Sequence, residues 1–320
     1  MGYAQLFNVD LIAIMQQENL IKVLKYINAK TDIAIPKLFF EYLKDHNKYK
    51  ISPSDYKIYE FYKLTKNEKE NIITKGQSKQ AIKRLNKLTN VNEYKLKNQF
   101  YKKYNSYLNR HWLELTGSNI AEFYDFANKY THLLSTTNDI TISKNTITPD
   151  LKNYTKLYNE LVLNGKSIIE EPLTEMEPLS SLNPNAFNII RMITLNNEII
   201  YSYLITMYNE TELFAPINIE TGIIDYDACD LLKNTYDFHP ITSQQINWLT
   251  IPKWPRTKRF TLKVALENPD LKYQEIDLIM STNGPALIKI NPSPNYQNIE
   301  LMNLIYKKDS LKKLLKEEGE

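Results

Sequence analysis

Glycine and cysteine are both scarce in this chain. Its 320 residues include seven glycines and a single cysteine, Cys229. One thiol excludes an internal disulfide framework and favours a reducing compartment. Because Asp227 and Asp230 flank it, Cys229 is expected to be inert rather than nucleophilic.

Long apolar runs and an excess of one charge are also missing. No run approaches the roughly 20 residues that a membrane-spanning helix needs, and the first residues lack the basic region of a signal peptide. The 40 basic and 37 acidic residues give a net charge of +3, spread without a basic stripe. We therefore expect a cytoplasmic protein with no transmembrane segment and no nucleic-acid partner.

Helical periodicity dominates the first third of the sequence. Apolar residues return at three- and four-residue steps from residue 11 to about 110. Ser52-Pro53 predicts a helix cap followed by a first-turn proline, and Thr65 with Glu68 predicts a capping box. These signals indicate an N-terminal helical region over residues 1–95. A C-terminal region, 301–320, is expected to hold one amphipathic helix over Leu301–Leu315 that packs back on the body.

Strand patterns begin near residue 138. A short strand is expected at Asp139–Ser143, leading to Lys144, and a helix at Leu151–Leu163 that stops at Asn164-Gly165. Two hairpins follow from alternating runs around turn residues. They comprise Ala186–Leu195 with Glu198–Met207, and Gln274–Ser281 with Ala286–Asn291, and a helix is expected between them at Phe260–Leu266.

The second hairpin carries the best constellation for chemistry. Alternation puts Glu275, Asp277 and Ile279 on one face and predicts a shared face for Leu287, Lys289 and Asn291. Pairing would bring Asp277 close to Lys289 and Asn291. Two alternatives stay open: oxygen ligands for Mg²⁺ and nucleotide phosphates, or a metal-free salt bridge between Asp277 and Lys289, which residue chemistry alone favours.

The stretch from Ser167 to Leu195 adds a second set of polar residues. A β-branched run ends at Glu170 and Glu171, and Pro172 then breaks the strand. Further on, Asn188 and Arg191 interrupt an otherwise apolar strand. An arginine in such a place is suited to hold two oxygens at once because its guanidinium is a planar fork.

In order along the chain, these motifs resemble the ATP-grasp superfamily. The likeness is carried by Lys144, Ile168-Ile169-Glu170-Glu171, Ser181-Leu182-Asn183-Pro184, Asn188 to Arg191, His239-Pro240, Ile251 to Trp254, Asp277 and Asn291. More narrowly, the chain is similar to the sugar-transfer-associated branch found in bacterial surface-polysaccharide gene clusters. The resemblance runs from about Asp55 to about Gln297.

The resemblance implies an α+β, ATP-grasp-like fold with an N-terminal helical extension. Two α+β subdomains, 96–165 and 166–300, would enclose a nucleotide cleft that binds ATP and Mg²⁺. The implied activity is ATP-dependent carboxylate-amine ligation through an acyl phosphate. By position, the implied site residues are Lys97 and Lys144 for the nucleotide, Glu170 and Glu171 at the hinge, Arg191 as the phosphate clamp, and Asp277 and Asn291 for the metal.

The chain also departs from the family pattern. No glycine occurs between Gly117 and Gly165, where a phosphate loop is expected, and Lys289 replaces a metal-binding glutamate. Glu275 is a candidate for the missing carboxylate, and the Lys289 ammonium is a candidate for the place of a metal. A ligase and an inactive binding or scaffold protein of the same pathway both stay open, as does a structural role unrelated to nucleotides. Expected partners are a nucleotide and a glycan-linked or small carboxylate substrate, with peripheral association to surface-glycan machinery.

Overall fold

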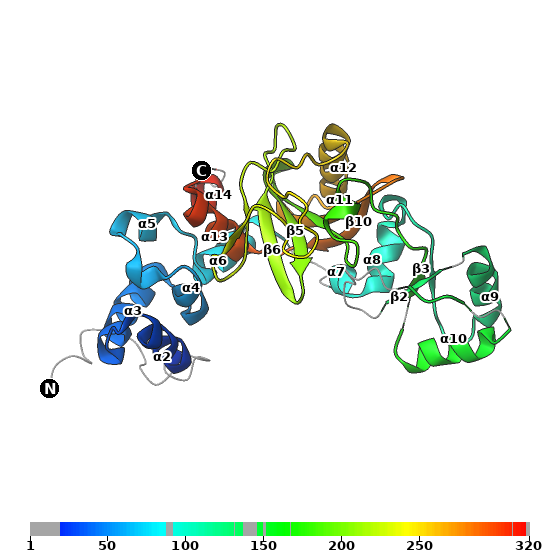
Figure 1. Ribbon diagram of the computed structural model, residues 1–320, viewed down its shortest axis with the longest axis horizontal. Helices are drawn as coiled ribbons and strands as arrows, with labels where there is room; N and C mark the ends of the chain where they lie inside the picture. Colours follow the sequence, from blue (N-terminus) through cyan, green and yellow to red (C-terminus); the bar gives the residue numbers. More distant parts are fainter. Residues whose placement is uncertain are drawn as a thin grey trace. The chain divides into compact units, whose positions relative to one another are not determined.

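The computed structural model describes residues 20–87, 92–130, 132–136, 146–149, 152–166, 168–308 and 310–317. Contacts divide the chain into two compact units (Figure 1). Unit 1 consists of Met1–Ala81 and Tyr296–Glu320, and unit 2 of Ile82–Asn295. The boundaries expected from the sequence at residues 95, 165 and 300 stay predictions. Within the described ranges, no helix is long and apolar enough to cross a membrane.

Unit 1 is built from helices. The predicted caps are confirmed: the Ser52 hydroxyl accepts from the Asp55 backbone N–H at 3.1 Å, and Thr65 and Glu68 form a reciprocal capping box. The unit comprises α2 (Leu20–Thr31), α3 (Ile35–Tyr49), α4 (Pro53–Ile58), the 3₁₀ helix η2 (Phe61–Lys63), α5 (Lys66–Asn71), most of α6 (Lys75–Leu85), α13 (Tyr296–Tyr306) and α14 (Leu311–Glu317).

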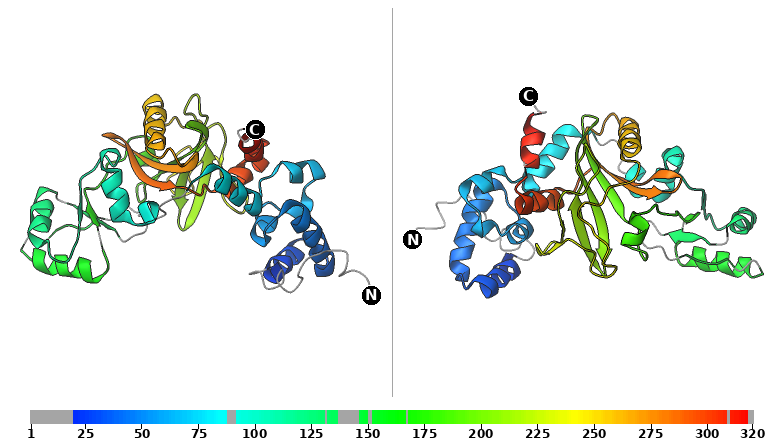
Figure 2. Two further views of the ribbon diagram at one scale, coloured as in Figure 1. Left: turned by 180° about the vertical axis from the view of Figure 1, so that it is seen from behind. Right: turned by 45° about the horizontal axis from the view of Figure 1, so that its top comes forward.

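Aromatic and aliphatic side chains from both ends of the chain form the core of unit 1. Tyr56 and Phe61 are buried in the same cluster as Leu301 of α13, and the Tyr296 hydroxyl donates to Asp55 at 2.9 Å. Figure 2 shows α13 and α14, in red, beside the N-terminal helices. The expected single helix Leu301–Leu315 is wrong, because the chain turns through left-handed backbone at Lys307 (φ 53°) and divides it in two.

Unit 2 contains a three-stranded antiparallel sheet of order β1-β3-β2. Its strands are β1 (Trp112–Glu114), β2 (Leu134–Thr136) and β3 (Ile168–Glu170), and α9 (Ile120–Lys129) and α10 (Tyr154–Leu163) pack with it around Phe123, Tyr158 and Ile169. The predicted end of α10 is confirmed by left-handed Gly165 (φ 68°). The strand expected at Asp139–Ser143 lies outside the described residues. Preceding the sheet are α7 (Asn92–Lys95), α8 (Lys97–Lys103) and η3 (Asn105–Tyr107).

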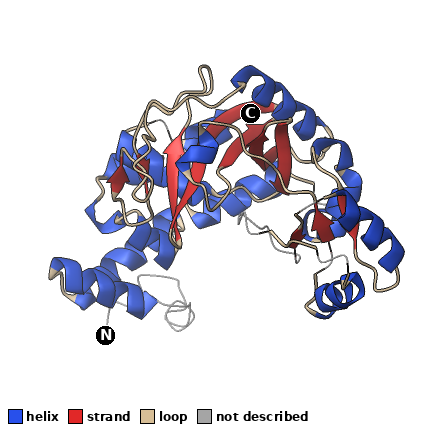
Figure 3. Ribbon diagram, turned by 45° about the vertical axis from the view of Figure 1, so that its right-hand side comes forward, coloured by secondary structure: helices blue, strands red, loops and turns tan. Residues whose placement is uncertain are grey.

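A seven-stranded antiparallel sheet of order β10-β9-β4-β5-β6-β7-β8 forms the rest of unit 2. Both predicted hairpins are confirmed, and Asn196 and Asn197 have positive φ as a tight two-residue turn requires. All named strands of the described residues lie within Ile82–Asn295, the range of unit 2, and Figure 3 shows the strands in red. The large sheet contains β4 (Ile189–Leu195), β5 (Glu198–Tyr208), β6 (Thr211–Pro216), β7 (Ala228–Cys229), β8 (Thr235–Tyr236), β9 (Tyr273–Ser281) and β10 (Gly284–Asn291).

Helix α12 (Trp254–Leu266) packs its apolar side on this sheet, and α11 (Leu179–Leu182) contributes to the same core. Val264 and Ala265 are buried with Met192 of β4 and Leu278 of β9. The helix begins six residues before the expected start at Phe260, because Pro255 occupies its first turn, where a missing N–H costs nothing. The sheet face that α12 covers is therefore part of the core. Because successive side chains of a strand point to opposite faces, the residues between these core residues lie on the other face of the sheet.

A β-bulge in β10 corrects the predicted alternation. Leu287 pairs with Leu278, but Lys289 pairs with Asp277, which leaves Ile288 as an extra residue. Leu287 consequently faces the core with Leu278, while Lys289 and Asn291 share the other face with Asp277. The expectation that Leu287 shares a face with Lys289 and Asn291 is wrong, since the bulge reverses the alternation between them.

Candidate functional site

Charged and polar side chains gather on the face of the large sheet opposite α12. They come from neighbouring strands β5, β4, β9 and β10, whose register puts them side by side. Because β-strand side chains alternate, the neighbours of these residues along each strand are core residues. We call this group the sheet-face cluster, and it consists of Arg191, Tyr203, Glu275, Asp277, Lys289 and Asn291.

Arg191 is the centre of the sheet-face cluster. It lies directly opposite Asp277, and its Nε and Nη2 donate to the two carboxylate oxygens at 2.7 and 2.9 Å. On the other side, Nη1 donates to the Tyr203 hydroxyl at 3.3 Å. Burial alone would lower the pKa of Arg191, but the Asp277 carboxylate raises it well above its usual range. Arg191 is therefore a fixed cation, held in a bidentate pair.

Glu275 lies on the same strand face and is fully enclosed. Its Oε1 is 3.4 Å from Arg191 Nε and accepts from the Asn291 amide at 3.2 Å, while Oε2 accepts from the Asn295 backbone N–H at 2.8 Å. Burial raises the pKa of Glu275, Arg191 lowers it, and the nearby Asp277 charge raises it again. The net effect is a raised pKa, so Glu275 keeps a proton to a higher pH in this site than a glutamate does in water.

Lys289 completes the cluster from β10, opposite Asp277 in the strand register. Its side chain is partly exposed. Among the described residues it has no hydrogen bond or ion pair, so the predicted direct salt bridge to Asp277 is not formed. The cluster thus brings two cations, Arg191 and Lys289, together with two carboxylates.

The donor set of this cluster does not fit Mg²⁺. The ion demands oxygen ligands in near-octahedral geometry. Both Asp277 oxygens accept hydrogen bonds from Arg191, and the two Glu275 oxygens accept hydrogen bonds from Asn291 and Asn295. In the part of the chain that the structure describes, no group of three or more His, Cys, Asp or Glu side chains could hold a metal. To bind a divalent cation, Asp277 would have to give up its hydrogen bonds with Arg191. The positive charge of Lys289, which lies opposite Asp277, would also repel the cation.

A second buried ionic group lies at the end of β3, which we call the hinge cluster: Lys97, Tyr101, Arg110 and Glu170. Glu170 Oε1 is 3.0 Å from Lys97 Nζ, and Oε2 accepts from the Tyr101 hydroxyl at 2.8 Å and from Arg110 Nε. Burial favours the neutral acid, but Arg110 and then Lys97 hold the pKa of Glu170 at about 2. Burial also lowers the pKa of Lys97, whose side chain is only 11% exposed.

The predicted site residues therefore fall into separate groups. Arg191, Glu275, Asp277, Lys289 and Asn291 come together on the sheet face, and Lys97 meets Glu170 at the hinge. Lys144 lies outside the described residues. Glu171 belongs to neither group, and the nucleotide roles of Lys97, Lys144, Glu170 and Glu171 stay predictions.

Some members of the clusters were not expected at a site. Tyr203 faces Arg191 only because a bulge shifts the pairing of β4 with β5. Arg110 and Tyr101 come from segments distant from Glu170 in the sequence. Tyr101 lies one turn after Lys97 on α8 and Arg110 lies just before β1, but neither position indicates a contact with Glu170.

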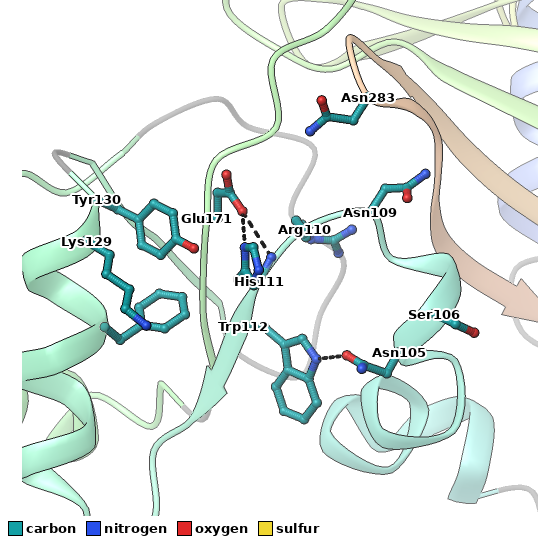
Figure 4. Close-up of a pocket in the computed structure, with 11 residues that line it drawn as sticks. Asn105, Ser106, Asn109, Arg110, His111, Trp112, Lys129, Tyr130, Glu171 and Asn283 are labelled. Atoms are coloured by element: carbon teal, nitrogen blue, oxygen red, sulfur yellow. Dashed lines mark hydrogen bonds and ion pairs between the residues drawn. The ribbon is translucent and has the colours of Figure 1, made fainter.

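A pocket of about 520 Å³ opens beside the hinge cluster, where the end of α9 faces η3 and the start of β1 (Figure 4). Glu171 lies at its centre, and one oxygen accepts from the His111 backbone N–H at 3.1 Å and from its ring Nδ1 at 2.8 Å. The remaining lining is aromatic or polar and uncharged, apart from Arg110 and Lys129: Asn105, Ser106, Asn109, Trp112, Phe126, Tyr130 and Asn283.

Comparison with known proteins gives one family. The profile of the family described as "Sugar-transfer associated ATP-grasp" matches residues 135–317, more than half of the chain. This match confirms the resemblance recognised in the sequence motifs. A comparison with curated proteins gives no match.

The solved structures that match include a D-alanine–D-alanine ligase and the ATP-grasp ligase PsnB. D-alanine–D-alanine ligase from Bacillus anthracis, complexed with ATP, is 14% identical with a TM-score of 0.39, over 71% of this chain and 69% of that one. The ligase PsnB, complexed with a precursor variant, Mg and ADP, is 11% identical with a TM-score of 0.39, over 68% of this chain and 59% of that one. The chain thus spans about three fifths of PsnB. At these values, the family rests on the profile match.

Proposed function

Because the chain belongs to the sugar-transfer associated ATP-grasp family, we propose that it is a nucleotide-binding protein of surface-glycan or glycopolymer biosynthesis. In this proposal the phosphates of ATP meet the sheet-face cluster, with Lys97 and Lys144 as further cations. The cluster supports such a role since Arg191 and Lys289 present positive charge on one rigid sheet face. Guanidinium and ammonium groups are the usual protein partners of phosphate oxygens.

One observation favours binding over catalysis. The bidentate pair of Arg191 and Asp277 is neutral by itself, and Lys289 opposite Asp277 adds a positive charge without a metal ion. Phosphoryl transfer depends on stabilising the charge that develops on the moving group, usually with a divalent cation. A face that supplies cations only from side chains favours retention of ATP over its cleavage. We therefore propose a binding or scaffold protein, with peripheral association to the glycan machinery, rather than a ligase.

A second candidate function is ATP-dependent ligation of a glycan-linked or small carboxylate to an amine. Glu275 favours it, because a second carboxylate shares the Asp277 face and contacts Asn291. In that reaction a substrate carboxylate oxygen attacks the γ-phosphorus and the bond to ADP breaks. An amine then attacks the acyl carbon, the C–O bond to phosphate breaks, and the ammonium proton passes to solvent.

Isothermal titration of the full chain with ATP, with and without Mg²⁺, tests the proposal. We expect binding whose dissociation constant changes less than about threefold with Mg²⁺, and a loss of at least about fivefold in Lys289→Ala. Lys263→Ala, which removes an exposed lysine of α12, is the matched control and should bind as the wild type does. No binding at millimolar ATP would overturn the nucleotide proposal. Mg²⁺-dependent binding with ADP release in the presence of a carboxylate and an amine would establish the ligase instead.

A further inference from the structure

The pocket beside the hinge cluster has walls suited to a flat ring. Trp112 forms one wall, and its position is fixed because its indole N–H donates to Asn105 at 2.8 Å and its ring meets Tyr101 edge-on at 5.3 Å. Phe126 and Tyr130 form another wall with ring centroids 5.0 Å apart. Figure 4 shows Trp112 on β1 and Tyr130 just after the end of α9 among the side chains that line the pocket. Such surfaces offer apolar contact area at low entropic cost.

Hydrogen-bonding groups lie between these walls. Glu171 is 31% exposed, and only Oε2 of its carboxylate is bonded, to His111. Its Oε1 has no partner among the described residues and is free to accept from a ligand hydroxyl. Asn283 lies across the pocket and adds a side-chain amide (Figure 4), whereas the amide of Asn109, which also lines the pocket, donates to the Pro285 carbonyl. The combination suits a ligand with apolar faces and several hydroxyl groups.

The charges disfavour a phosphate here. Arg110 lines the pocket, but its guanidinium is committed to Glu170, Tyr101 and the Leu108 carbonyl. Glu171 would repel a phosphate. Lys129 is the lining cation with no ion pair among the described residues, and it is exposed. A neutral polyhydroxyl ring avoids both difficulties.

We propose that this pocket binds the pyranose ring of a neutral sugar, stacked on Trp112 and hydrogen-bonded to Glu171. The ring's C–H face contacts the indole, and ring hydroxyls donate to the open Glu171 oxygen. This site does not use the sheet-face cluster, so it stands apart from nucleotide binding there. It gives Glu171 a role different from the nucleotide hinge expected from the sequence.

Saturation-transfer NMR on the full chain tests the site, with the methyl glycosides of glucose, galactose and N-acetylglucosamine as probes. We expect transfer to the ring protons of at least one glycoside, with a dissociation constant of about 1–10 mM. Trp112→Ala and Glu171→Gln should each weaken binding at least about fivefold. Trp248→Ala, which removes an exposed tryptophan outside the pocket, should leave it unchanged. Glu171→Gln keeps the shape of the side chain, so the test does not depend on the folding of Trp112→Ala.

Three outcomes would overturn the proposal. One is no transfer to any of the glycosides at about ten times the expected dissociation constant. Another is equal binding in wild type, Trp112→Ala and Glu171→Gln. The third is displacement of the sugar by ATP with loss of ATP binding in Glu171→Gln, which would make the pocket a nucleotide site. Failure of ATP binding in the Lys289 experiment leaves these results unaffected, so the two proposals fail separately.

Discussion

Arg191 and Asp277 meet across neighbouring strands as a bidentate pair with two hydrogen bonds, at 2.7 and 2.9 Å. Both side chains are mostly buried, at 14% and 5% exposure. Removing two charges from water is costly, and their attraction offsets that cost only when both partners are present. The pair is therefore a fixed feature of the sheet, and the loss of one partner is worse than the loss of both.

We predict that Asp277→Asn lowers the free energy of unfolding of unit 2 by about 3–5 kcal/mol, because Arg191 keeps its charge without a full partner. The measurement is urea denaturation followed by tryptophan fluorescence, since all three tryptophans belong to unit 2. Lys102→Ala breaks an exposed ion pair with Glu114 and should cost less than about 1 kcal/mol. Equal losses in the two variants would contradict a strong buried pair.

Lys289→Glu is predicted to create a metal site. It turns the side chain opposite Asp277 from a cation to a carboxylate, so Glu275, Asp277 and the new glutamate share one face. We expect Mn²⁺ affinity, measured by the loss of the free-ion EPR signal, to rise at least about tenfold over wild type. Lys263→Glu on α12 makes the same charge change away from the cluster and should bind Mn²⁺ as the wild type does. The same affinity in both variants would mean that this face is not a latent metal site.

We predict that the stability of the hinge cluster falls at acid pH because the pKa of Glu170 is lowered in the folded protein. Its pKa falls from 4.5 to about 2 in the folded protein, so its ionised form stabilises the fold above about pH 5, and this stability is lost as the pH falls toward 2. The loss amounts to about 3 kcal/mol. Glu170→Gln should therefore have a much lower free energy of unfolding than wild type at pH 7. The difference in free energy of unfolding between the two proteins should shrink by about that amount near pH 2. A gap that is independent of pH would contradict this linkage.

We predict the opposite pH dependence of stability for unit 1, because the pKa of Glu300 is raised in the folded protein. Burial raises its pKa from 4.5 to about 8, while the Ser310 hydroxyl and the backbone N–H groups of Ile73 and Leu311 oppose the shift. A raised acid pKa disfavours the charged folded state, so unit 1 should lose stability as the pH rises from about 5 to about 8.

Glu300→Gln should remove this loss, and the variant should gain about 4 kcal/mol relative to wild type between pH 5 and pH 8.5. Hydrogen exchange of peptides from α13 and α14 follows unit 1 directly. Exposed Glu70→Gln is the control, and its effect should not change over this range because the pKa of Glu70 is lowered. No difference in pH dependence between wild type and Glu300→Gln would refute the prediction.

Local signals predicted much of this fold. Caps at Ser52 and Thr65 and the Asn196-Asn197 turn are set by interactions within a few residues, so the sequence indicates them directly. The single helix expected over Leu301–Leu315 failed for a related reason. Its apolar spacing continues through Lys307, and no proline or glycine marks the break there.

The site was less predictable because it depends on strand register. Counting back from the Asn196-Asn197 turn puts Ser202 opposite Arg191, but a bulge shifts the partner to Tyr203. The burial of Glu170 depends on Lys97 and Arg110, which are distant in sequence, and charge alone does not show which carboxylate they meet. Residue types were therefore predictable, while their partners were not.

The extra residue Ile288 in β10 determines which face of the sheet each later residue of the strand points to. If β10 paired regularly through Ile288, Ile288 and Ile290 would face Asp277, and Lys289 and Asn291 would turn toward the core. The charge of the sheet-face cluster thus depends on a backbone irregularity as much as on the side chains that compose it.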